Sequence, residues 1–176
     1  TGFQAIKIAR QQDFDVMLLD ISLPDRNGID ILKQIKKDRP NLAVLMLSMH
    51  NEHEFAIRAL KAGAAGYLNK QSAPAQLVVA IRQVAAGDKY VSPAVAQELA
   101  NSINTDADKP LYTTLSDREY QTLCFIAEGK TLSEISAEMF LSPKTVSVYR
   151  ARLLEKLNLT NNSELIRYAI KNKLVD

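Results

Sequence analysis

The sequence has little of several features that would place a protein in a class at once. It holds a single cysteine among 176 residues, which excludes an internal disulfide and a cysteine-rich zinc site. That residue, Cys124, sits in an apolar stretch and is expected to be buried rather than to act as a nucleophile. No apolar run approaches the roughly 18 residues needed to cross a bilayer, and residues 1–20 lack the pattern of a signal peptide. The expected location is the cytoplasm.

The chain also has little net charge, because 22 basic and 20 acidic residues leave a total of +2. A nucleic-acid-binding protein needs a basic contact face rather than a basic total. Only residues 142–157 form a basic segment, in which Lys144, Arg150, Arg152 and Lys156 stand against Glu155. On charge alone, a nucleic-acid contact face and an ordinary solvated helix face explain this segment equally well.

Short apolar runs lie in the first half of the chain. Val16–Leu19 and Ala43–Leu47 are almost wholly apolar, and Ala65–Leu68 is a weaker third run. Such runs are typical of buried parallel strands, whose two faces are both covered. Apolar residues at helical spacing fill the intervals, so strands alternate with helices, which predicts an α/β fold with a parallel sheet. The helical stripes are Ile29–Ile35, Phe55–Ala62 and Leu77–Val84.

This alternation stops near residue 90. The polar segment 101–114 has the composition of a linker. Beyond it the spacing predicts only helices, at residues 116–128, 131–139, 143–158 and 162–171. We therefore expect an α/β domain over residues 1–90, a helix and linker over 91–113, and an all-α domain of four helices over 114–176.

Polar side chains follow each predicted strand. Asp20 closes the first, Ser48 closes the second and Lys70 follows the third. Because the carboxyl ends of parallel strands meet at one edge, we expect the three side chains to converge there. A carboxylate nucleophile beside a hydroxyl and an ammonium suits phosphoryl transfer onto Asp20. Taken singly, a strand-terminal aspartate is more often a cap or turn residue; the ordered set of three is far more specific.

The same residues carry a resemblance. Leu18–Gly28, Leu47-Ser48 and Gly66–Lys70 resemble the receiver domains of response regulators, a flavodoxin-like fold, over residues 1–90. The resemblance implies that Asp20 is the phosphoacceptor, that Ser48 and Tyr67 are the switch hydroxyl and switch aromatic, and that Lys70 is the family's lysine. It also implies a histidine kinase as partner.

One departure from the receiver pattern concerns Mg²⁺. Receivers hold this ion with an acidic pair that follows their first strand, and that strand, the first helix and the second strand have no counterpart in this sequence. Asp20 and the carbonyl of Ser22 are the remaining ligands, which are too few to fix the ion. Asp13 and Asp15 precede their strand and are not offered as replacements. We expect an incomplete metal site and a poor phosphoacceptor.

The same departure predicts exposed surface. The strand ending at Asp20 would have no neighbour on one side, and the stripe of Leu77, Val78, Ile81 and Val84 would be partly bare. An unpaired strand edge and an apolar patch both promote association. We therefore expect self-association through Val16–Leu19 or a rearranged N-terminal half.

The C-terminal helices carry clear start and stop signals. Ser116 and Glu119 form the pattern of a capping box, Gly129 is a C-cap, and Ser142-Pro143 starts the third helix. That helix should bury Val146, Tyr149, Leu153 and Leu157. Small side chains flanked by basic ones on its other face suit the major groove; an ordinary amphipathic helix is the alternative. The candidate DNA-binding residues are Lys144, Thr145, Ser147, Val148, Arg150, Ala151 and Arg152.

Residues 114–174 resemble the LuxR-type helix-turn-helix, on Leu115-Ser116-x-Arg118-Glu119, Leu141-Ser142-x-Lys144-Thr145-Val146 and Lys156-Leu157. With a receiver in front, the chain resembles the NarL/FixJ response regulators. The resemblance implies that Ser147, Val148 and Ala151 face the bases. Two positions depart from the family: Tyr149, where histidine is common, and Asn161 or Asn162, where an arginine is.

The resulting hypothesis is a two-component response regulator, not an enzyme, in which phosphorylation of Asp20 controls sequence-specific binding to double-stranded DNA, as a homodimer. Leu165, Tyr168 and Ala169 of the last helix are either a dimer face or packing against the domain's own helices. The alternative function is a phosphorylation-independent DNA-binding or protein-interaction module. The sequence does not specify the operator, the kinase and its signal, or activation versus repression.

Overall fold

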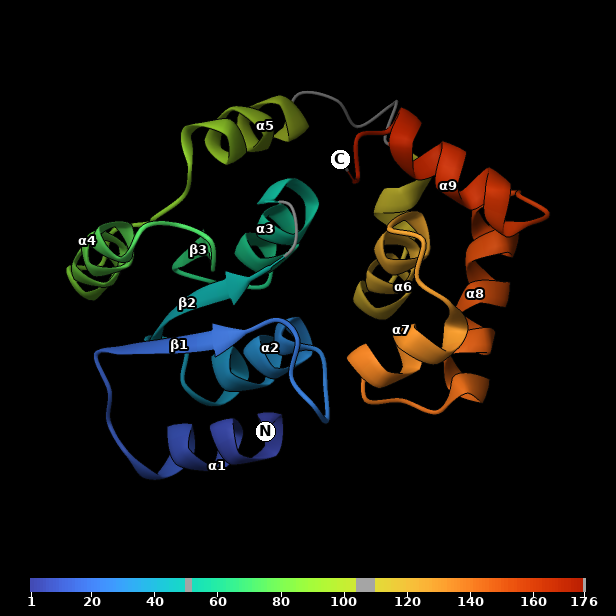
Figure 1. Ribbon diagram of the computed structural model, residues 1–176. Helices are drawn as coiled ribbons and strands as arrows, with labels where there is room; N and C mark the ends of the chain where they lie inside the picture. Colours follow the sequence, from blue (N-terminus) through green and yellow to red (C-terminus); the bar gives the residue numbers. More distant parts are fainter. Residues whose placement is uncertain (50–51, 104–109, 176) are drawn as a thin grey trace. The chain divides into compact units, whose positions relative to one another are not determined.

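The computed structural model describes residues 1–49, 52–103 and 110–175 (Figure 1). The chain divides into two compact units, Thr1–Asn104 and Thr105–Asp176. Residues 104–109 of the predicted linker lie outside the described residues. The domain boundaries expected at residues 90 and 113 stay predictions. None of the described helices is both long and apolar enough to cross a membrane.

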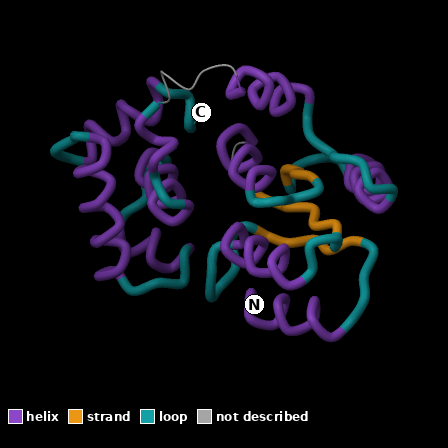
Figure 2. Tube along the Cα trace, turned by 180° about the vertical axis from the view of Figure 1, so that it is seen from behind, coloured by secondary structure: helices purple, strands orange, loops and turns teal. Residues whose placement is uncertain are grey.

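The first unit is built on a parallel sheet of three strands in the order β1-β2-β3, seen as the orange segments of Figure 2. The α/β prediction is confirmed, and each strand ends one residue later than its apolar run, because a polar residue closes it. The strands are β1 (Val16–Asp20), β2 (Ala43–Ser48) and β3 (Gly66–Asn69).

Helices cover both faces of this sheet. Leu45 and Leu68 pack against Ala80 and Val84 of the helix that follows β3. Side chains alternate along a strand, so the buried Met46 points to the opposite face. The helices of the unit are α1 (Gly2–Gln11), α2 (Gly28–Asp38), α3 (Glu52–Lys61), α4 (Pro74–Ala85) and α5 (Pro93–Ile103).

Helix α1 was not expected from the sequence. It buries only Gly2 and Ala9, so it has no broad apolar stripe to reveal it. Its first turn is held instead by a distant side chain: Asp25 accepts hydrogen bonds from the N–H groups of Gly2 and Phe3, at 2.7 and 2.9 Å. Although burial opposes the effect, these bonds hold the pKa of Asp25 below its usual value.

The two edges of the sheet differ. Beside β3, Tyr90 exchanges backbone hydrogen bonds with Ala65 and Tyr67. Among the described residues, β1 has no strand partner on its outer side. Leu18 of β1 is 44% exposed and Val78 of α4 is 48% exposed. An open edge and a partly bare α4 stripe agree with the expectation from the sequence, although Val84 of that stripe is buried.

The second unit is wholly helical, as predicted. A short 3₁₀ turn precedes four helices whose buried side chains, including Leu123, Ile135, Leu153 and Leu165, form its core. The predicted caps are present: Ser116 and Glu119 form a capping box, and Gly129 takes a positive φ of 82°. The elements are η1 (Leu111–Thr114), α6 (Asp117–Ala127), α7 (Leu132–Glu138), α8 (Pro143–Leu157) and α9 (Asn162–Lys171).

Candidate phosphoacceptor site and nucleic-acid interface

Asp20 and Lys70 meet at the carboxyl edge of the sheet. Lys70 Nζ donates to Oδ2 of Asp20 in an ion pair, although the two residues lie on opposite sides of β2. The N–H of Ser22 donates to the other oxygen, Oδ1, at 3.1 Å. Both side chains remain partly exposed, at 26% for Asp20 and 34% for Lys70. The carboxylate is thus held by a cation and a backbone donor but stays within reach of solvent.

Two further residues of the predicted site, Ser48 and Tyr67, are buried. Ser48 is 1% exposed, and its carbonyl accepts a hydrogen bond from Lys70 N at 2.8 Å, which fixes where the lysine leaves the sheet. Tyr67 is 3% exposed, so its ring lies inside the unit here rather than in solvent. The structure thus places Ser48 at the same edge as Asp20 and Lys70, while the roles of Ser48 and Tyr67 stay predictions.

The loop that follows Asp20 and carries Ser22 is held in place where it meets α2. Asn27 is fully buried and caps α2 by accepting from Ile29 N at 2.8 Å. A side chain at Gly28 would overlap the carbonyl of Asp20, so only glycine lets α2 start this close to the strand. The sequence reasoning did not single out Asn27 and Gly28, although an asparagine before a glycine at a helix start is a readable capping signal.

The side chains at this edge do not fit Mg²⁺. The described residues contain no group of three metal-ligating side chains. Asp20 Oδ2 is taken by Lys70, and Asp25 is engaged with the first turn of α1. A single carboxylate and the Ser22 carbonyl fall short of the coordination that Mg²⁺ needs. No chemical step is therefore assigned to a metal.

In the second unit, α8 presents a polar face to solvent. Val146, Leu153 and Leu157 are buried as predicted, whereas Tyr149 is only half-buried. Among the predicted DNA-binding residues, Thr145 and Arg150 are half-buried. The exposed ones are Lys144, Ser147, Val148, Ala151 and Arg152.

Two of the four cations of this segment are engaged inside the unit. Lys156 Nζ donates to Oε2 of Glu119 at 2.7 Å, and Arg150 Nε donates to Oδ1 of Asn162 at the start of α9. Lys144 and Arg152 make no ion pair or hydrogen bond with any described side chain. Their charges are the ones available to an external anion.

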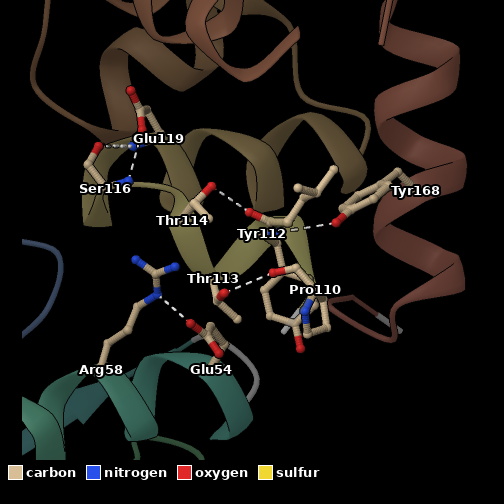
Figure 3. Close-up of polar contacts among 10 residues, drawn as sticks. Glu54, Arg58, Pro110, Tyr112, Thr113, Thr114, Ser116, Glu119 and Tyr168 are labelled. Atoms are coloured by element: carbon tan, nitrogen blue, oxygen red, sulfur yellow. Dashed lines mark hydrogen bonds and ion pairs between the residues drawn. The ribbon is translucent and has the colours of Figure 1, made fainter. Parts of the chain in front are cut away.

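Glu119 is the buried anchor of this arrangement. It is 2% exposed and also closes the capping box with Ser116 (Figure 3). Burial raises its pKa, but the hydrogen bonds from Lys156 and Ser116 outweigh burial and hold the pKa of Glu119 below its usual value. It therefore stays ionised and ties the start of α6 to the end of α8.

Two of the three residues named on α9 pack inward. Leu165 and Ala169 are fully buried in the unit, where α9 contacts α6, so they cannot form a dimer face. The alternative stated from the sequence, packing against the domain's own helices, holds for them. Tyr168 accepts a hydrogen bond from Tyr112 N at 3.1 Å through its hydroxyl oxygen and so fastens η1 to α9 (Figure 3).

Comparison with known proteins matches both units. The model of the response regulator receiver domain matches residues 1–82, and that of bacterial regulatory proteins of the luxR family matches residues 113–169. Response regulator UvrY of Escherichia coli K12 is 37% identical over 174 residues, which cover 98% of this chain and 80% of UvrY. The chain belongs to the response regulators that join a receiver to a LuxR-type helix-turn-helix.

A second curated relative and a solved structure are also similar to this chain. Response regulator GacA of Pseudomonas aeruginosa is 37% identical over 176 residues, covering 99% of this chain and 82% of GacA. Among solved structures, RcsB of Salmonella enterica serovar Typhimurium, bound to a promoter in the presence of the phosphomimetic BeF3⁻, has a TM-score of 0.52 and 28% identity. The match covers 95% of this chain and 80% of RcsB.

Proposed function

We propose that this response regulator controls transcription by binding duplex DNA through the exposed face of α8, under the control of phosphorylation at Asp20. The observation that carries the DNA-binding part is the pair of unengaged cations, Lys144 and Arg152, beside the small side chains of Ser147 and Ala151. Small side chains permit close approach to the bases, while the cations neutralise phosphates on either side.

Asp20 is the proposed phosphoacceptor. One carboxylate oxygen attacks the phosphorus of a phosphohistidine in the partner kinase; the P–N bond breaks, an acyl phosphate forms and the imidazole leaves. Lys70 already lies against the carboxylate, so its charge can stabilise the added phosphoryl oxygens. Partial exposure of Asp20 leaves it accessible to a donor.

A second candidate function follows from the metal site. Receivers are expected to use Mg²⁺, but the described residues do not supply a site for it. DNA binding independent of phosphorylation is therefore the alternative. The test is labelling of the chain by acetyl phosphate, with and without Mg²⁺, followed by the affinity of each sample for DNA. Labelling at Asp20 that tightens the DNA binding of the labelled fraction, however small that fraction is, supports phosphorylation control; DNA binding that labelling leaves unaltered supports the alternative.

The partners follow from the same proposal. A histidine kinase donates the phosphoryl group, and a homodimer binds two half-sites of the operator. RcsB, of related sequence and fold, was solved on a promoter with a phosphomimetic, which supports this assignment. A regulator of bacterial promoters acts in the cytoplasm, as a binding protein rather than an enzyme.

A further inference from the structure

The turn between α7 and α8 contains an aromatic residue in an unfavourable place. Phe140 takes a positive φ of 53° and is 59% exposed. Its N–H donates to Ala137 O, and the following N–H, of Leu141, donates to Ser136 O. These two bonds form a Schellman motif that ends α7, with Phe140 at the left-handed position.

The other long helices of the unit end in the same way, with Gly129 after α6, Asn158 after α8 and Lys173 after α9, all at positive φ. Lys173 shares the backbone conformation of Phe140 but exposes a charged side chain rather than an apolar ring, and the other two residues are better suited to the conformation itself. Glycine carries no Cβ to clash, and asparagine can offset the strain with its side-chain amide. A phenylalanine does neither, and a bulky residue there is a true outlier.

Phe140 is therefore unfavourable for the stability of the folded chain in two ways. Its backbone conformation is strained, and its apolar ring is largely exposed to water. Neither feature stabilises the unit. Strain of this kind, when it persists, points to a function outside the folded unit itself.

The position of the residue indicates what the ring contacts. Phe140 lies two residues before Ser142, the N-cap of α8, and four before Lys144, one of the two unengaged cations. In helix-turn-helix proteins the first turn of the recognition helix enters the major groove, so residues just before it lie beside the phosphate backbone. A deoxyribose offers an apolar surface between two charged phosphates, which an aromatic ring can cover while Lys144 neutralises a neighbouring phosphate.

We infer that Phe140 packs against the sugar backbone of bound DNA and so adds an apolar contact to the electrostatic ones of α8. This inference rests on the proposed DNA-binding function. The strained turn then presents the ring, and the unfavourable exposure is relieved only in the complex.

The test uses the full chain and a short labelled duplex, selected from a random-sequence pool by the wild-type protein. Phe140→Gly removes both the strain and the ring. We expect its melting temperature to rise by about 4 °C and its DNA affinity to fall by at least about threefold. The slope of log affinity against log salt should not change, because losing an apolar contact releases no counterion.

Three further variants separate the causes. Phe140→Tyr keeps the ring and should bind as tightly as wild type. Phe140→Asn also removes the ring, and asparagine tolerates a positive φ. Its DNA affinity should fall as far as that of Phe140→Gly, which would show that the loss does not come from the flexibility of glycine. Asn158→Gly makes a matched backbone change at the other end of α8 and should leave affinity unaltered.

The outcomes are distinguishable. Phe140→Gly with wild-type affinity would overturn the inference while leaving the proposed function intact. Reduced affinity with a flatter salt slope would overturn it too, because α8 would then have shifted and lost a phosphate contact. Failure of the wild-type chain to select any DNA would remove both the inference and the proposed function.

Discussion

Lys156 Nζ lies 2.7 Å from Oε2 of Glu119, so the last turn of α8 is tied to the first turn of α6 by a carboxylate that is almost fully buried. The same carboxylate accepts from Ser116 N at 2.8 Å. This contact fixes how α8 leaves the core, and it removes Lys156 from the cations that can meet DNA.

The Glu119 contact makes stability depend on pH. Its pKa is lower in the folded chain than in the unfolded one. Its contribution to the free energy of unfolding is therefore fully present above the ordinary value of about 4.5 and is lost as pH falls through the lower folded value. We expect Glu119→Gln to destabilise the second unit by about 1–3 kcal/mol at neutral pH. The difference in the free energy of unfolding between this variant and the wild type should be smaller at about pH 3.

Thermal unfolding at both pH values measures this effect. Glu155→Gln, at an exposed glutamate of α8 next to Lys156, serves as the control and should change little. A Glu119→Gln chain as stable as wild type at neutral pH would show that the buried contact adds nothing.

Arg152 and Lys156 should differ in their effect on DNA binding. Arg152→Ala removes an unengaged cation, so affinity should fall for all sequences and the salt slope should flatten by about one unit. Lys156→Gln removes a charge already neutralised by Glu119 and should leave the slope unchanged. Fluorescence anisotropy over a range of salt concentrations separates them; equal slopes for Arg152→Ala and wild type would take Arg152 out of the phosphate contacts.

Labelling at Asp20 tests the account of the metal site. The chain should take up very little phosphoryl group from acetyl phosphate, with or without Mg²⁺, because the side chains present do not fit the ion. Asp20→Asn should abolish what remains by removing the nucleophile. Stoichiometric, Mg²⁺-dependent labelling of the wild-type chain would refute this account; the intact mass of the protein reports it directly.

The open edge of β1 should promote self-association. Leu18 is 44% exposed beside backbone groups that have no strand partner among the described residues. Leu18→Lys places a charge on this edge and should reduce association. Val79→Lys, on the exposed side of α4, is the comparison variant. Sedimentation velocity and hydrogen exchange test this prediction: a monodisperse wild-type monomer with strongly protected amides over residues 15–20 contradicts it.

Features encoded locally could be predicted from the sequence. Residue types and spacing alone specify the capping box of Ser116 and Glu119, the left-handed Gly129 and the short apolar strands. The meeting of Asp20 and Lys70 followed from one topological rule, that parallel strands end at a common edge.

Features that depend on a residue far away in the sequence could not be predicted. The first turn of helix α1 is held by Asp25, which lies in the loop after β1. The sequence of the helix has no broad apolar stripe from which it could be predicted. The basic count over residues 142–157 treats Arg150 and Lys156 as free, because counting cannot show that Asn162 and Glu119 engage them. The apolar spacing of Leu165 and Ala169 fits an outer or an inner face equally well, and only packing decides.

The central claim is that α8 binds DNA through Lys144 and Arg152. Its most direct test is to measure how DNA affinity depends on salt concentration. The measurement compares the wild-type chain with the double variant Lys144→Ala, Arg152→Ala. We expect salt-dependent binding by the wild type and a slope flatter by about two units in the double variant, with thermal stability retained. An unchanged slope, or a wild-type chain that binds no duplex DNA at low salt, would contradict it.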